Sequence, residues 1–172
     1  VILIGIQALI IIVGIVIFRM PLPDHEIDVT GLPLTDFVEI IRDERGIPHI
    51  YGTNVDDILF AQGYVHAQDR FWQLEFWSHL STGRLASLIG EPGVGADLLF
   101  RTFGFHKIAL EEYENLEPEF KQDLINYTNG VNAYIESRPQ NRLSLEHFVL
   151  QFINPDYVVG TYEPYYPLAL AK

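Results

Sequence analysis

The stretch that decides the fold runs from Val38 to Gly90. It begins VEIIRDERGIPHIYG (residues 38–52), continues DDILFAQGYVHAQDRFWQLE (56–75) and ends STGRLASLIG (81–90). In its first part, two short runs rich in β-branched residues flank Asp43–Gly46, which predicts a hairpin with a loop of about three to five residues. Gly46 can adopt φ > 0 without steric cost. Pro48 cannot donate a ladder hydrogen bond, so the second strand should start near it or lie at a sheet edge.

A long helix should follow this hairpin. Thr53 or Asn54 can cap its start, and Asp56 and Asp57 suit the positive end of a helix dipole. Residues at helical spacing then line one face, and Gly83 suits a stop. That face comprises Ile58, Leu59, Ala61, Val65, Gln68, Phe71, Leu74, Trp77 and Leu80.

Further helices are expected after Gly90. One should run from about Ala96 to Glu114, with an apolar face broken by Gly104. Another should start at Pro118, where apolar residues recur at spacings of four, three, four and three, the clearest amphipathic pattern in the chain. These residues are Phe120, Leu124, Tyr127, Val131 and Tyr134.

The C-terminal part contains weaker signals. Arg138–Pro139 should end the amphipathic helix, because proline disfavours helical backbone at the residue before it. Residues 145–152 predict a short helix, and a turn-rich segment follows from Asn154. The apolar run from Leu168 predicts the beginning of a helix that continues elsewhere.

The N-terminal segment is apolar from Val1 to Phe18 apart from Gln7, with Gly5 and Gly14 as further interruptions. At about 1.5 Å per residue it would span roughly 27 Å, close to the thickness of a hydrocarbon core. No small-x-small cleavage site follows Phe18, which favours a retained anchor over a cleaved signal.

These observations predict three parts. Residues 1–19 are a transmembrane anchor or uncleaved signal segment, with a buried core helix as the alternative. Residues 20–36 are a linker in which Ile27, Val29 and Leu32 could add a short strand. Residues 37–172 are one domain. Because no Met begins the chain, we expect residues before Val1, and we expect the domain to continue past Lys172.

Composition excludes several classes of function. The 23 acidic and 11 basic residues give a formal net charge of −12, which argues against nucleic acid as a partner. The absence of cysteine excludes disulfides, thiolate metal sites and a cysteine nucleophile from this chain. Aromatic residues make up 13% of the chain, which implies a dense core or a large surface for another chain.

The search for chemistry finds no complete active site. His49, His66 and His79 lack the i, i+4 spacing of a helical metal pair, so structural or surface roles are expected. Asp69 and Arg70 are adjacent on a helix and should bond to other residues. The other candidates are also expected to be structural. Asp56 and Asp57 are interpreted as helix-start residues, and the glycines Gly90, Gly93 and Gly95 do not form a phosphate loop. None of the serines lies in a nucleophile elbow: Ser78, Ser81, Ser87, Ser137 and Ser144.

Glu75 lies within an aromatic cluster, and its position can be interpreted in two ways. An exposed position is the expectation. The alternative is a buried acid with a raised pKa.

Several motifs follow one another in a fixed order: Val38–Asp43, Gly46–Ile50, Gly63–Arg70, Gln73, Glu75, Gly83–Ala86, Leu88–Gly90, Asp97, Arg101, Gly104, Tyr127–Ala133 and Tyr162–Pro164. In this order they resemble the start of the α chain of the penicillin acylase (penicillin amidase) family of N-terminal-nucleophile hydrolases. The resemblance covers about Leu32 to Lys172. Ser87 stands where an acid is common, Tyr162 stands where Trp is usual, and Asn154–Thr161 is longer than typical.

The resemblance implies a self-processing amidohydrolase. In such enzymes the precursor cuts itself into α and β chains, and the N-terminal Ser of the β chain attacks the amide carbonyl with its own α-amine as base. The residues of the acyl pocket, and an acid that binds calcium in some members, belong to a helix that should begin near Leu168 and extend past Lys172. We therefore assign no catalytic or metal residue to this chain, leave its substrate-binding residues unknown, and expect calcium only in the complete enzyme.

The expected fold is mainly α with a short β-hairpin, the α-chain portion of an αββα architecture, plus one transmembrane helix. The expected partners are a β chain carrying the nucleophile, a membrane contacted through residues 1–18, and a small-molecule amide such as a penicillin or an acyl-homoserine lactone. The domain should be anchored outside the cytoplasm, in the periplasm or at the cell surface, and be inactive alone. The alternative is a non-enzymatic, membrane-anchored module of the same fold that binds a partner.

Overall fold

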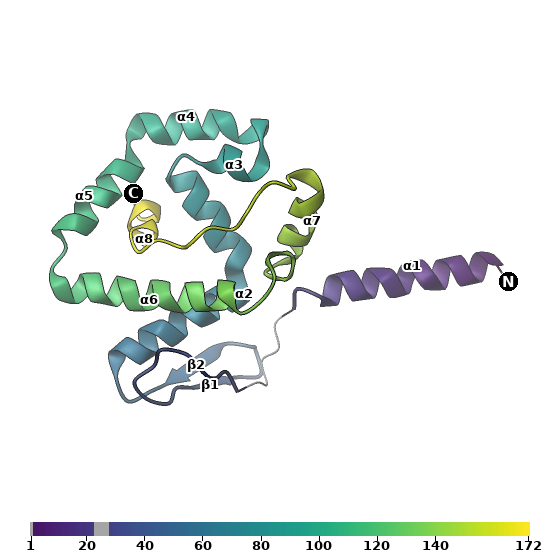
Figure 1. Cartoon of the computed structure of the whole chain (residues 1–172), viewed down its shortest axis with the longest axis horizontal. Coiled ribbons are helices and arrows are strands. Elements are labelled where there is room, and N and C mark those ends of the chain that lie inside the picture. Colours follow the sequence, from purple (N-terminus) through teal and green to yellow (C-terminus); the bar gives the residue numbers. More distant parts are fainter. Residues whose placement is uncertain (1, 23–27) are drawn as a thin grey trace.

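The computed structural model describes residues 2–22 and 28–172, which are mostly helical with a two-stranded sheet (Figure 1). The first elements in chain order are α1 (Ile2–Arg19), β1 (Glu39–Arg42), β2 (Pro48–Tyr51), α2 (Val55–Ser81), α3 (Leu85–Ile89) and the 3₁₀ turn η1 (Glu91–Gly93). They are followed by α4 (Val94–Phe103), α5 (Phe105–Asn115), α6 (Pro118–Glu136), the 3₁₀ turn η2 (Gln140–Arg142), α7 (Leu145–Ile153) and α8 (Tyr166–Leu170).

The N-terminal helix α1 lies apart from the other helices in Figure 1 and exposes side chains such as Ile4 and Phe18, so it is not a buried core helix. The prediction of a membrane anchor over residues 1–19 is not supported, because no helix in the described part of the chain is both long and apolar enough to cross a membrane.

The segment before the hairpin contains no strand over residues 28–38. Val29 and Leu32 therefore do not add the strand that the sequence suggested, and Ile27 lies outside the described residues.

The hairpin forms as predicted. β1 and β2 pair antiparallel with Ile40 opposite Ile50, β2 begins at Pro48, and Gly46 has φ +78° in the turn. The turn is closed by Asp43, whose Oδ1 accepts the Ile47 backbone N–H at 2.9 Å.

A bidentate ion pair connects the hairpin to α2. The guanidinium of Arg42 donates to both carboxylate oxygens of Asp69 at 2.9 and 2.8 Å, and to Gln68 Oε1 at 2.8 Å. These contacts explain part of the Gly63–Arg70 motif as attachment of the sheet.

The long helix α2 is capped by Asn54, whose Oδ1 accepts the Asp57 N–H at 2.8 Å. It ends at Ser81, and Gly83 follows with φ +68°. At Arg70 the backbone leaves the helical region (φ −140°, ψ 28°), which kinks the helix. The sequence gives no sign of this kink, since no proline or glycine stands there.

The main core lies where α2 crosses α6. Phe71, Val131 and Tyr134 are fully or almost fully buried there, and the rings of Tyr64 and Tyr134 meet edge to face at 5.5 Å. The face predicted for α6 is therefore correct at Val131 and Tyr134, but Phe120 near its start is 60% exposed.

The predicted helix from Ala96 to Glu114 is two helices. Gly104 adopts a left-handed conformation (φ +74°) between α4 and α5, so the chain turns there instead of continuing. The short helix α7 and the helical start near Leu168, now α8, agree with expectation. Figure 1 shows α8 enclosed by α2, α4, α5 and α6, and α8 packs on both α2 and α5.

Candidate functional site

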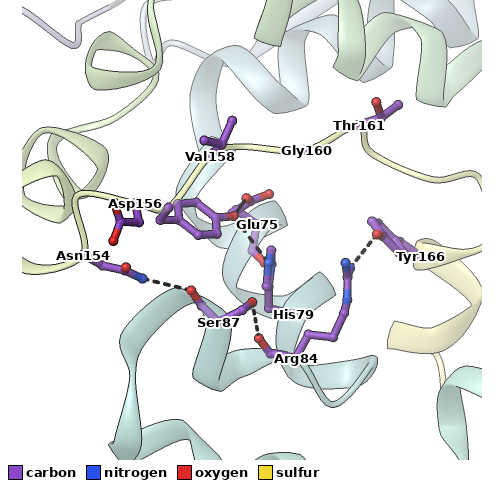
Figure 2. Close-up of a pocket in the computed structure, with 11 residues that line it drawn as sticks. Glu75, His79, Arg84, Ser87, Asn154, Asp156, Val158, Gly160, Thr161 and Tyr166 are labelled. Carbon is purple, nitrogen blue, oxygen red and sulfur yellow. Dashed lines mark hydrogen bonds between the residues drawn. The ribbon is translucent and has the colours of Figure 1, made fainter.

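A polar cavity of about 360 Å³ lies between the C-terminal half of α2, the turn before α3 and the segment that joins α7 to α8. Figure 2 shows its side chains converging from these elements. Its lining residues are Glu75, His79, Arg84, Ser87, Asn154, Asp156, Tyr157, Val158, Gly160, Thr161 and Tyr166.

Glu75 reaches this cavity from α2 and is only 4% exposed. Burial raises the pKa of its carboxyl group, while the hydrogen bond from Tyr157 and the charge of Arg84 act in the opposite direction. The expectation of an exposed Glu75 is wrong, and the alternative of a buried acid with a raised pKa is correct.

Tyr157 lies between Glu75 and His79. Its hydroxyl donates to Glu75 Oε1 and lies 3.3 Å from His79 Nε2. The other imidazole nitrogen, Nδ1, is 2.9 Å from the Glu75 backbone carbonyl. A carbonyl can only accept, so Nδ1 carries the proton and Nε2 of the neutral ring is an acceptor.

The protonation of this cluster follows from its burial. Burial lowers the pKa of His79, and burial together with the neighbouring Glu75 carboxyl raises the pKa of Tyr157. At neutral pH, Tyr157 is therefore protonated and the His79 ring is neutral. Over the described residues, however, no hydroxyl other than that of Tyr157 is bonded to His79, so the cluster has no serine or threonine nucleophile.

Arg84 closes the other end of the cavity. Its Nη2 donates to Tyr166 Oη at 2.5 Å, its guanidinium lies 5.1 Å from the centre of the Tyr166 ring, and its Nε donates to Thr82 Oγ1 at 2.9 Å. Burial raises the pKa of Tyr166 to about 12. Arg84 thus links the turn after α2 to α8.

The turn that carries Arg84 is held from α4. Both oxygens of buried Asp97 accept backbone N–H groups, from Leu85 at 2.6 Å and from Ala86 at 2.9 Å, which caps α3. Arg101 Nε donates to the Gly83 carbonyl at 2.7 Å. The motifs Gly83–Ala86, Asp97 and Arg101 therefore form a single unit.

The remaining candidates have structural partners. His66 Nδ1 is 3.1 Å from the Tyr127 hydroxyl, and His49 is 3.7 Å from the Asp43 carboxylate. Asp56 accepts from Asn126, and Asp57 accepts the backbone N–H groups of Thr35 and Asp36. The hydroxyls of Ser78, Ser81, Ser87 and Ser137 donate to backbone carbonyls within the chain.

His147 is a buried titratable residue to which the sequence analysis assigned no role. Its ring packs against Phe71 and Trp72, its Nδ1 is 2.9 Å from Ser144 Oγ, and its Nε2 has no hydrogen-bond partner in the described structure. Burial, with a smaller contribution from His79, lowers its pKa to about 4. The spacing Ser144-x-x-His147 at a helix start was the available signal, because a serine cap faces the third helical residue.

Comparisons with known proteins place this arrangement in context. The penicillin amidase family profile matches residues 37–172. The penicillin acylase 2 proenzyme of Pseudomonas sp. (strain SE83) is 40% identical over 100 residues, which are 58% of this chain and 13% of that protein.

Two further relatives give the same picture. The acyl-homoserine lactone acylase QuiP of Pseudomonas putida is 36% identical over 102 residues, covering 59% of this chain and 12% of the relative. Penicillin G acylase of Escherichia coli is 33% identical over 99 residues, covering 58% of this chain and 12% of the relative. The matched region therefore spans only about an eighth of the curated relatives.

A solved structure supports the fold. A thermostable penicillin G acylase from Alcaligenes faecalis superposes with a TM-score of 0.63 at 22% identity, covering 78% of this chain and 69% of that one. Together with the profile match over most of the sequence, this shows that the chain belongs to the penicillin amidase family.

Proposed function

We propose that this chain is the α-chain part of a self-processing amidohydrolase that cleaves the amide bond of N-acyl compounds. Its nucleophile is the N-terminal serine of a second chain cut from the same precursor, and this chain alone is inactive. The observation that carries the proposal is the family match over residues 37–172.

The geometry is consistent with a scaffold role. Several residues of the motifs that resemble the family make attachments: Arg42 binds Asp69, Asp97 caps α3, and Arg101 holds the turn at Gly83. A proenzyme among the relatives supports the expectation of a processed precursor. The αββα architecture requires a sheet larger than this hairpin, which the second chain would supply.

Two substrate classes follow from the relatives' names. Penicillin acylases and acyl-homoserine lactone acylases both act on an amide between an acyl group and an amine. We infer that this enzyme takes a substrate of the same kind, an N-acyl compound from one of these two classes.

Calcium and location complete the proposal. We propose that calcium, where the complete enzyme binds it, is held by residues past Lys172; among the described residues no three or more His, Asp or Glu side chains are grouped so that they could share a metal. We propose a location outside the cytoplasm, to be checked by cell fractionation.

The test uses the complete polypeptide encoded by the gene. We expect two bands on a denaturing gel, and release of free amine from penicillin G or from an acyl-homoserine lactone. Replacing the serine at the new N-terminus by alanine should abolish both cleavage and hydrolysis.

The matched control is Lys107→Ala in the same polypeptide, since within the described residues Lys107 forms just an exposed pair with Glu111 at 3.6 Å. It should cleave and hydrolyse normally. A folded, single-band product without hydrolase activity would overturn the proposal and favour the non-enzymatic, partner-binding module.

A further inference from the structure

The polar cavity beside the C-terminal half of α2 contains an acid and a guanidinium that do not bind each other. Glu75 accepts a hydrogen bond from Tyr157. Arg84 donates to Tyr166 and to Thr82. Among the described residues there is no ion pair between Glu75 and Arg84. Each charged group is therefore held by its own neighbours, and both face a common space of about 360 Å³.

Both groups keep bonding capacity that the described part of the chain leaves unused. Tyr157 occupies Oε1 of Glu75, and no described residue bonds to Oε2. Oε2 is not among the fully buried atoms that lack a partner, so it reaches the open space of the cavity although Glu75 is only 4% exposed. Arg84 uses Nε and Nη2, which leaves Nη1 as a further donor within the same part of the chain. A carboxylate oxygen this far from bulk solvent needs a donor, because a buried charge is costly unless it is paired.

The other polar side chains of the cavity distinguish its two ends. In Figure 2, Asn154 and Asp156 lie at one end, and Arg84 and Tyr166 lie at the other. The side-chain amide of Asn154 donates to backbone carbonyls of α3, which leaves its Oδ1 as an acceptor. Asn154 and Asp156 therefore add acceptors on the side of the cavity away from the guanidinium.

We propose that this cavity binds a small α-amino acid, with its ammonium group on Glu75 and its carboxylate on Arg84. An ammonium group has three donors, for which Glu75 Oε2, Asn154 Oδ1 and the Asp156 carboxylate are acceptors. The carboxylate accepts a charge-assisted hydrogen bond from the guanidinium. Binding needs the ionised form of Glu75, which the ammonium charge itself favours. A volume of about 360 Å³ is at the lower end of the range for small-molecule pockets, which suits a small side chain.

The test compares three probes of similar size on the complete polypeptide encoded by the gene. L-Alanine carries both charged groups, propionate lacks the ammonium group, and L-alaninol lacks the carboxylate. In isothermal titration calorimetry, L-alanine should bind at least about tenfold more tightly than either analogue, because each analogue loses a hydrogen bond between charged groups. None of the probes is an amide, so the result is independent of the proposed hydrolase activity.

Two substitutions locate the site. Glu75→Gln removes the buried charge and should weaken the binding of L-alanine at least about tenfold. Its matched control is Glu111→Gln, which removes an acid from the exposed surface of α5 and should leave the affinity unchanged. Asp156→Asn changes an exposed residue at the rim, so the protein should fold normally and bind about threefold more weakly. Melting curves show whether the Glu75→Gln protein is folded.

Three results would overturn the proposal. One is equal affinity for L-alanine, propionate and L-alaninol, because the charged ends of the ligand would then not be recognised. Another is unchanged binding in a folded Glu75→Gln protein or, should that protein not fold, in Asp156→Asn. The third is no binding of L-alanine, glycine or L-serine at about 10 mM, as would follow if the second chain filled the cavity.

Discussion

Helix α2 is held on two sides by different means. Towards α6 the backbones almost touch: a Cβ at Gly63 would lie 1.9 Å from the Tyr127 carbonyl oxygen, and a Cβ at Gly130 would lie 1.8 Å from that of Phe60. Towards α4, the turn that follows α2 is held by polar side chains: Asp97 and Arg101 bond to its backbone groups.

The two contacts show that the glycine motifs and the polar motifs stabilise the fold in different ways. The α6 side depends on glycines whose absent side chains allow close approach, so no substitution there is conservative. The α4 side depends on hydrogen bonds that a similar polar group can replace in part. We therefore expect the two sides to respond differently to mutation.

The largest effect is expected from Gly130→Ala. The added methyl cannot fit against the Phe60 backbone, so the helices must separate and the free energy of unfolding should fall by at least about 3 kcal/mol. Urea unfolding followed by circular dichroism measures the loss.

The control for this substitution is Gly95→Ala in α4, where nothing lies within 4 Å of the added atom. It should stabilise by about 0.5–1 kcal/mol through helix propensity. Equal effects at the two glycines would refute the close-approach explanation.

Asp97→Ala tests the polar side. It leaves the Leu85 and Ala86 N–H groups without their acceptor, which should cost about 2–3 kcal/mol. Asp97→Asn keeps one oxygen as acceptor and should lose roughly half as much in the same urea titration. If Asn proved as harmful as Ala, the partial replaceability of this side would be disproved.

His147 extends the comparison to the contact between α7 and α2. Its pKa is lowered to about 4 from 6.5, so the folded state disfavours the charged ring. The contribution of the neutral His147 ring to the free energy of unfolding is therefore complete above pH 6.5 and is lost as the pH falls from 6.5 towards 4. Between pH 7 and pH 5 the free energy of unfolding should fall by about 2 kcal/mol. His147→Phe should remove this pH dependence, measured as the difference in unfolding free energy between the two pH values; an unchanged dependence would assign it to other groups.

The smallest effect is expected from Arg42→Lys at the hairpin. Lysine keeps the charge but cannot donate to both oxygens of Asp69, so about 1 kcal/mol should be lost. Hydrogen exchange of the hairpin amides, compared with those of α6, should show that only the hairpin loosens. Loosening of α6 as well would mean that the hairpin supports the core.

Local signals predicted much of this fold. Asp43–Gly46 predicted the hairpin, and Val131 and Tyr134 predicted the buried face of α6. Asn54, one of two residues expected to cap α2, is its cap. Gly104 was noticed as a break in the face, but the left-handed backbone that divides α4 from α5 was not inferred from it.

The candidate site was not predictable in the same way. Tyr157 and Glu75 are 82 residues apart, and only the packing of the segment after α7 against α2 brings them together. Periodicity describes one helix at a time, so it assigned Glu75 to an exposed face. The kink at Arg70 was likewise not predictable from local signals, since no proline or glycine stands there.

The phenol of Tyr157 has one hydrogen to give and two neighbours that can take it. When Glu75 is neutral, its O–H can donate a hydrogen bond to the tyrosine oxygen, and the phenol O–H can then donate to His79 Nε2. When Glu75 is ionised, it accepts the hydrogen bond from the phenol, and Nε2 of His79 then lacks a donor from Tyr157. The cavity beside it is wide enough to admit a solvent molecule for that purpose, so its hydration should rise and fall with the charge of a single carboxyl group.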